Sequence, residues 1–188
     1  MNTNQQNLDY IASLIGQCHK CPLYQTATNH VPGFGNPQAS IVIIGEAPGF
    51  YEDQQGLPFV GNSGKLLDKL LSTISLNRAD VFICNILKHR PPNNRDPLPE
   101  EIRVCVPFLK AQLKVIKPKI IITLGRFALN FFFPADSITK VHGQGRNLSW
   151  QGMNLYIFPV YHPSAGLRNG AMLSALQNDF IKIGKHLI

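Results

Sequence analysis

The chain has 188 residues, 44% of them hydrophobic, which fits a single domain over residues 1–188 with one sizeable buried core. Lys and Arg total 18 against 11 Asp and Glu, so the formal charge is +7 and a polyanionic partner is favoured over a basic one. No stretch has the length of a membrane span, and the polar N-terminus lacks the pattern of a signal peptide, so we expect a cytoplasmic protein without a membrane function.

Hydrophobic periodicity predicts helices and strands that alternate along most of the chain. The expected helices are 7–16, 64–75, 97–116, 125–132 and 170–186, and the expected strands are 38–45, 81–84, 119–124 and a hairpin of 147–150 with 155–160. Residues 18–37 have no clear period. This order predicts the α/β class, as a three-layer α/β/α sandwich around a central, mainly parallel four-stranded sheet.

A Gly-rich segment, Gly45–Gly61, leaves directly from the apolar run at 41–44. Its four glycines and two prolines exclude a regular helix or central strand, so we expect a shaped loop at the end of a buried strand. The loop carries Glu46, Glu52, Asp53 and Phe59. On chemistry alone, these carboxylates are compatible with a metal site, a solvated surface or catalysis.

Polar residues also follow two later strands: Asn85 ends one, and His162 begins the loop after another. Ligands of open α/β sheets bind beyond the carboxyl ends of the strands, so three loops are expected to form one site. An Asn side chain offers a donor and an acceptor together, which suits the edge of a nucleobase. A His can donate to an oxygen that gains charge, although a single His is more often structural.

The chain has four cysteines, Cys18, Cys21, Cys84 and Cys105. A reducing compartment disfavours disulfides, so each is a core residue, a reactive thiol or a metal ligand. Cys18 and Cys21 form a C-x-x-C pair before Pro22, a common metal-binding spacing that is weak by itself.

Five ordered motifs carry a resemblance to a known family. They are Gly45-Glu-Ala-Pro-Gly49, Gly56-Leu-Pro-Phe-Val-Gly61, the run Asn85–Arg95, Thr123-Leu-Gly-Arg126 and the run His162–Asn169. The chain resembles the family 4 uracil-DNA glycosylases, the iron-sulfur branch of that superfamily, from about Cys18 to the last helix. The resemblance implies monofunctional excision of uracil from DNA at the start of base-excision repair.

The resemblance also implies roles in base recognition. Phe59 would stack on an extruded uracil, Asn85 would hydrogen-bond its amide edge, and His162 would donate to the oxygen that becomes anionic. The backbone around Glu46 and Ala47 would contact the base. Cytosine presents a donor where uracil presents an acceptor, so Asn85 held in one orientation would face that donor with its own, and this mismatch excludes cytosine.

Two positions depart from the best-known branch of the superfamily. Gly49 replaces a tyrosine that blocks the methyl group of thymine, so Glu52 is the candidate for that block and would line the pocket or hold the loop. Ala47 replaces an aspartate that assists water, as is usual for family 4, so the reaction must depend on stabilising the departing uracil anion. Glu46 and Glu52 remain as carboxylates that could offset sugar charge or orient water.

The family's four-iron four-sulfur cluster is expected on Cys18, Cys21, His89 and Cys105, because His89 stands where the family has its third cysteine. Imidazole replaces thiolate on iron in Rieske centres, so His89 is chemically suitable. Cys84 is the alternative, but adjacent strand residues face opposite ways, so Cys84 should face the core if Asn85 faces the pocket. Zinc on the same ligands is a further alternative.

Contacts to DNA are expected from the last loop and from the loop after Asn85. The candidates are Ser164, Arg168 and Asn169, an apolar wedge at Leu167, and Lys88, Arg90 and Arg95. We expect a monomer whose product passes to downstream base-excision repair enzymes. A non-catalytic iron-sulfur DNA-binding module and a redox carrier are alternatives. So is the branch that becomes covalently trapped on DNA, but its inserted basic loop is missing here.

Overall fold

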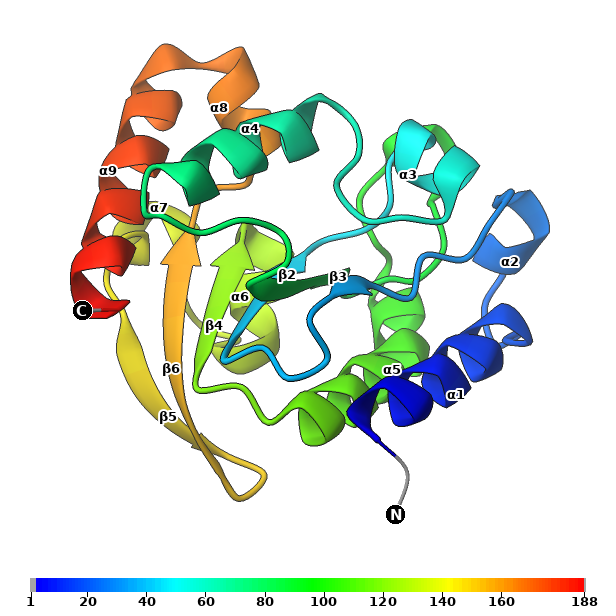
Figure 1. Cartoon of the computed structure of the whole chain (residues 1–188). Coiled ribbons are helices and arrows are strands. Elements are labelled where there is room, and N and C mark those ends of the chain that lie inside the picture. The colour runs from blue at the N-terminus through cyan, green and yellow to red at the C-terminus, as the bar shows by residue number, and fades with distance from the viewer. Residues whose placement is uncertain (1–2, 188) are drawn as a thin grey trace.

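The computed structural model describes residues 3–187 and contains a six-stranded sheet in the order β1-β3-β2-β4-β6-β5 (Figure 1). The four central strands, β3, β2, β4 and β6, are parallel, and the two edge strands pair antiparallel. The strands are β1 (Phe34–Gly35), β2 (Ile41–Gly45), β3 (Val81–Asn85), β4 (Ile120–Leu124), β5 (Arg146–Trp150) and β6 (Met153–Val160).

The expected four-stranded sheet is therefore wrong in its strand count, although its parallel centre is confirmed. The predicted hairpin is β5–β6, turning through Gln151 and Gly152, and it adds β5 to the same sheet as an antiparallel edge. The two residues of β1 lie in the segment expected to be irregular. A two-residue strand is too short for a period, so only its pairing with β3 reveals it.

Helices flank both faces of the sheet, and each face has its own hydrophobic core. The helices α1 (Asn4–Gly16), α5 (Pro99–Ile116) and α6 (Arg126–Phe132) pack against one face, and α4 (Asn62–Ser72) and α9 (Gly170–Leu187) against the other. Alternation along β2 explains this: Val42 and Ile44 enter the first core, and Ile41 and Ile43 enter the second. The α/β class is confirmed.

Short helices occupy several segments that were expected to be loops. They are α2 (Leu23–Thr26), α3 (Phe50–Gln55), the 3-10 turn η1 (Pro92–Asn94), α7 (Ile138–Val141) and α8 (Pro163–Arg168). The Gly-rich segment thus contains a helix, because its glycines lie at the ends of α3: Gly49 precedes it, and Gly56 ends it at φ +68°. Within residues 3–187, no helix is both long and apolar enough for a membrane crossing.

Candidate active site

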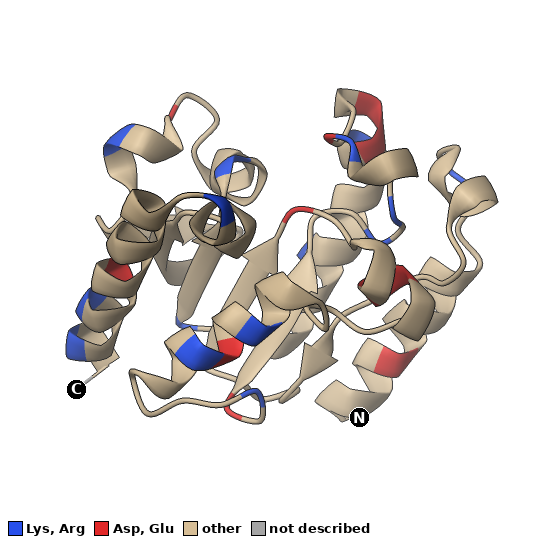
Figure 2. Cartoon of the chain, turned by 90° about the horizontal axis from the view of Figure 1, so that it is seen from above, with Lys and Arg blue, Asp and Glu red and all other residues tan. Residues whose placement is uncertain are grey.

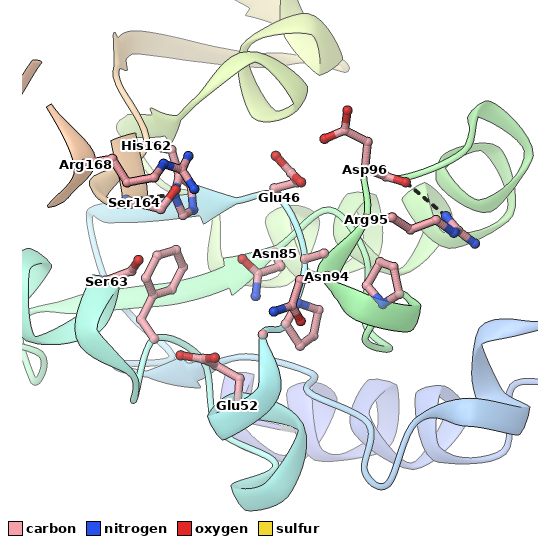
Figure 3. A pocket seen from close by; sticks show the side chains of 15 residues that line it. Glu46, Glu52, Ser63, Asn85, Asn94, Arg95, Asp96, His162, Ser164 and Arg168 are labelled. Atoms are coloured by element: carbon pink, nitrogen blue, oxygen red, sulfur yellow. Dashed lines mark hydrogen bonds between the residues drawn. The ribbon is translucent and has the colours of Figure 1, made fainter. Parts of the chain in front are cut away.

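A cavity of about 370 Å³ opens where the three expected loops converge, beyond the carboxyl ends of β2, β3 and β6 (Figure 3). This volume is typical of sites for small organic groups. The lining residues are Glu46, Ala47, Pro48, Gly49, Glu52, Phe59, Ser63, Asn85, Pro91, Asn94, Arg95, Asp96, His162, Ser164 and Arg168. Every residue that the sequence assigned to base contact or catalysis is among them.

Asn85 ends β3 with its side chain in the pocket and is 2% exposed. Its Oδ1 is buried without a hydrogen-bond partner. A buried unpaired acceptor costs free energy, so this atom is suited to a ligand donor. Gly45 makes room for it, because a Cβ there would lie 2.3 Å from Asn85 Oδ1.

His162 follows β6 and caps α8. Its Nδ1 accepts the backbone N–H of Ser164 at 3.2 Å and lies 2.8 Å from Ser164 Oγ. A backbone N–H can only donate, so the neutral ring carries its proton on Nε2. Burial, with a smaller contribution from the charge of Arg168, lowers the pKa of His162 to about 4. Near neutral pH, His162 is therefore an uncharged N–H donor.

Phe59 is buried, and its ring centroid lies 5.8 Å from that of His162. Its φ of +54° is unusual for a residue with a side chain, so the surrounding structure must hold it there. Arg78 does so, since its guanidinium donates to the carbonyls of Pro58 and Phe59 while pairing with Asp68. The backbone at Gly64 lies directly against the Phe59 carbonyl, which only glycine allows, because a Cβ on Gly64 would overlap that carbonyl.

The two candidate carboxylates have different surroundings. Glu52 Oε1 accepts the backbone N–H groups of Val60 and Gly61, each at 2.9 Å, so it holds the Gly-rich loop as well as lining the pocket. Glu46 lies between His162 and Asp96 in Figure 3. Burial and the nearby charge of Asp96 raise the pKa of Glu46 to about 7. A carboxyl poised near neutral pH in a pocket is suited to proton or charge chemistry.

Glu52 also occupies the space in front of Gly49. A Cβ on Gly49 would lie 2.8 Å from Glu52 Oε2. The carboxylate thus lies beside Gly49, the position at which the best-known branch of the superfamily has a tyrosine. The third acidic residue of the loop, Asp53, is outside this pocket lining: it is buried and accepts the backbone N–H groups of Thr28 and Asn29.

The proposed DNA contacts of the last loop separate into different environments. Ser164 and Arg168 line the pocket, and Leu167 is 51% exposed on α8. Asn169 accepts the backbone N–H groups of Ala171 and Met172, so it also caps α9. In Figure 2, lysines and arginines are spread over several elements with acidic residues among them.

In the loop after β3, Arg95 lines the pocket and donates to both carboxylate oxygens of Glu101, at 2.6 and 2.9 Å. Arg90 donates to Asn94 Oδ1 at 2.7 Å. Lys88 was expected to reach DNA, and that expectation is wrong. It is completely buried, and its Nζ donates to the carbonyls of Pro32 and Asn85 and to Gln112 Oε1.

The four expected cluster ligands come from elements on the α1 and α5 side. Burial raises the pKa of the Cys105 thiol to about 11, with much smaller contributions from Cys21 and Cys18, and the thiol accepts a hydrogen bond from the Lys88 backbone N–H, next to His89. Burial lowers the pKa of His89, with smaller contributions from His30 and from His19, the neighbour of Cys18. Cys84 lies in the core as expected, and burial raises the pKa of its thiol, partly offset by the nearby Lys88. Within residues 3–187, no three His, Cys, Asp or Glu side chains are arranged closely enough to hold a metal ion.

Several site residues were missed from the sequence. Ser63, Asn94 and Asp96 line the pocket, and Arg78 holds Phe59; Ser164 was predicted as a DNA contact, but its role in setting the protonation of His162 was not. For Ser164, the pattern His-Pro-Ser at a helix start was an available signal. Arg78 offered none, because its partners are backbone carbonyls about twenty residues away.

Comparison with known proteins identifies the family. Residues 32–185 match the model of the uracil DNA glycosylase superfamily. The type-4 uracil-DNA glycosylase of Archaeoglobus fulgidus is 45% identical over 185 residues, which cover 96% of this chain and 93% of that protein. That of Saccharolobus solfataricus is 46% identical over 187 residues (96% and 87%), and that of Sulfurisphaera tokodaii is 45% identical over 183 (94% and 83%). The chain therefore belongs to the type-4 uracil-DNA glycosylases.

Proposed function

We propose that this protein, acting as a single domain, excises uracil from DNA at this pocket and thereby starts base-excision repair. The observation that carries the proposal is the pairing of a buried, unpartnered acceptor, Asn85 Oδ1, with a neutral N–H donor, His162 Nε2, in one cavity. The amide edge of uracil presents an N–H beside carbonyl oxygens, which complements these groups. An enzyme that acts on a base must first extrude it from the stack into such a pocket.

Base recognition follows from the positions of three side chains. Asn85 accepts from N3–H through Oδ1 and donates to O4 through its amide nitrogen, so cytosine would meet a donor with a donor. Phe59, held by Arg78, stacks on the ring. Glu52 stands beside Gly49 and excludes the methyl group of thymine.

The chemistry is a dissociative break of the N-glycosidic bond. The bonding electron pair leaves with the base, and His162 Nε2–H donates to O2 as charge develops there. A carboxylate at Glu46 stabilises the cationic sugar, and water then adds to the sugar and releases its proton. Ala47 has no group that could act as a base, so leaving-group stabilisation carries the rate.

Single-turnover excision from a uracil-containing oligonucleotide tests the proposal. We expect Asn85→Ala and His162→Ala each to slow excision about 100- to 1,000-fold, the usual cost of losing one oxyanion-type donor. Asn154→Ala, at an exposed position on β6, is the matched control and should keep the wild-type rate. Near-normal rates in both pocket variants would reject the assignment.

Turnover, rather than covalent trapping, is supported by the position of His89, which is not among the residues lining the pocket. Its ring centroid lies 6.5 Å from that of His30. We therefore expect product release after each excision. A protein–DNA adduct that survives denaturing electrophoresis would contradict this.

We further propose that Cys18, Cys21, His89 and Cys105 hold a four-iron four-sulfur cluster. Three of the donors are thiols, and His89 directly follows Lys88, whose backbone N–H donates to Cys105. This donor chemistry suits iron-sulfur ligation. Such a cluster would stabilise the α1 and α5 side of the fold, and no step of the excision is assigned to it.

Iron and sulfide analysis of purified protein tests the ligand set. His89→Ala should lose iron and sulfide, His89→Cys should keep them, and Cys84→Ser should match the wild type. Loss of iron and sulfide in Cys84→Ser alone would show that Cys84, and not His89, is the fourth ligand. A colourless protein that contains zinc would show that these residues bind zinc instead of an iron-sulfur cluster.

A further inference from the structure

Two neighbouring aromatic residues at the start of α3 are turned to solvent. Phe50 is 50% exposed and Tyr51 is 57% exposed, and their rings meet edge to face with centroids 5.5 Å apart. Single exposed aromatics are common on protein surfaces. An adjacent pair beside a ligand pocket is a better candidate for a binding surface.

A cation completes this surface. The Arg90 guanidinium carbon lies 5.1 Å from the centroid of the Phe50 ring, within the range of a cation–π contact. Arg90 is also held by Asn94 Oδ1 at 2.7 Å, and Asn94 lines the pocket. We call Phe50, Tyr51 and Arg90 the α3 platform.

The α3 platform is continuous with the rim of the pocket. Glu52, the next residue of α3, lines the pocket, and a Cβ on Gly61 would lie 3.3 Å from Tyr51 Cδ2. Figure 1 places α3 on the opposite side of the strand ends from α8, which carries Leu167 and Arg168. A DNA strand with one base in the pocket can therefore contact α8 on one side and the platform on the other.

Flat aromatic rings beside a guanidinium bind unpaired bases by stacking, largely without regard to sequence. A base that remains paired is held inside the duplex, so its faces cannot lie against a platform outside the double helix. We propose that the α3 platform stacks an unpaired base next to the extruded uracil, which makes single-stranded DNA a favoured substrate. The proposal depends on the proposed function only in that the pocket receives the uracil.

Binding of a labelled, uracil-free single-stranded oligonucleotide, followed by fluorescence anisotropy, tests the platform apart from catalysis. We expect the double variant Phe50→Ala/Tyr51→Ala to bind about tenfold more weakly, in line with the stacking of one base. The ratio to wild type should persist at higher salt, because stacking releases no counterions. Phe50→Trp should bind like the wild type. Tyr10→Ala, which removes a 64% exposed aromatic from α1, is the matched control.

Single-turnover excision on single-stranded and duplex uracil substrates gives the second readout. The double variant should lose rate at sub-saturating enzyme on the single strand and keep it on the duplex. Equal losses on both would indicate a distorted loop and overturn the proposal, as would unchanged binding of the single strand. Self-association of the wild type that the double variant abolishes would assign the surface to a second copy instead. Wild type that binds single strands through the platform but excises nothing would refute the proposed function alone.

Discussion

The uracil pocket and the cysteine region, formed by Cys18, Cys21, His89 and Cys105, are organised in opposite ways. In the pocket, three key residues have partners within the chain that fix them: Ser164 for His162, Arg78 for the backbone of Phe59, and backbone N–H groups for Glu52. The chain alone thus sets the geometry of the pocket, which is the preorganisation that electrostatic catalysis needs.

In the cysteine region, burial opposes the state that binds metal. It raises the pKa of the Cys21 thiol and raises that of Cys105 to about 11, so both are protonated near neutral pH in the chain by itself. Metals bind the thiolate, so ligation there must displace protons. The pocket is therefore complete in the folded chain, whereas the proposed cluster would complete the cysteine region.

Lys88 links the two regions, and its loss should have the largest effect. Its Nζ donates to the Asn85 carbonyl, and its backbone N–H donates to the Cys105 thiol. Lys88→Met removes the donor of three hydrogen bonds, two of them buried, so we expect a loss of about 3 kcal/mol in the free energy of unfolding. Urea denaturation measures it, with exposed Lys65→Met as a control expected within about 0.5 kcal/mol of wild type. Weaker DNA binding at unchanged stability would contradict the structural role.

Gly45→Ala should disrupt the pocket and leave the cysteine region intact. The new Cβ would lie 2.3 Å from Asn85 Oδ1 and 2.5 Å from Phe59 Cζ, so both must move. A displacement of this kind costs about 100-fold in rate. Single-turnover excision measures the loss, while the iron content should not change. Gly170→Ala is the control, because nothing lies within 4 Å of its Cβ. An unaltered rate would show that the pocket adapts to the extra methyl group.

Glu52→Ala should reduce the selectivity of the pocket for uracil over thymine and so separate selectivity from the chemical step. Removing the carboxylate opens space beside Gly49 and frees the N–H groups of Val60 and Gly61. We expect the preference for uracil over thymine to fall about 10- to 200-fold, the range for one methyl group in a pocket. Excision rates on matched uracil and thymine substrates measure this preference. Glu52→Gln keeps the bulk and an acceptor oxygen, so it should stay selective; equal selectivity in all three proteins would place the block elsewhere.

Glu46→Gln should produce the smallest change, in the pH profile. If the Glu46 carboxylate stabilises the sugar cation, the wild-type rate rises with pH and levels off above its pKa of about 7. At pH 6 we expect the rate to be about tenfold below the plateau, as for one essential ionisation. His162, with a pKa of about 4, stays neutral throughout this range and adds no slope. Glu46→Gln should give a flat profile from pH 5.5 to 8; a slope that survives the substitution would assign the ionisation to another group.

Much of the fold was predictable because apolar periodicity is local. The parallel strands at Ile41, Val81, Ile120 and Met153 all fall within or near predicted segments, and the hairpin turn was found. The two-residue β1 and the short helix α3 were missed, since neither is long enough to show a period. The strand count was wrong partly for this reason, and partly because the predicted hairpin strand β5 was not counted in the sheet.

The candidate site shows the same division. The sequence by itself determined which groups end the strands, Asn85 and His162, and that one loop carries Glu46, Glu52 and Phe59. Alternation along β3 even predicted that Cys84 would face the core. These inferences depend only on residue type and on neighbours in the chain.

Only the tertiary structure decided the state of those groups. It buried Lys88, which the sequence had assigned to DNA, fixed the proton of His162 on Nε2 through Ser164, and raised the pKa of Glu46 to about 7. Burial and charge depend on residues brought together from distant segments, such as Asp96 beside Glu46. The order of residues along the chain therefore indicates which groups reach the site, whereas their protonation and their exposure to solvent depend on packing.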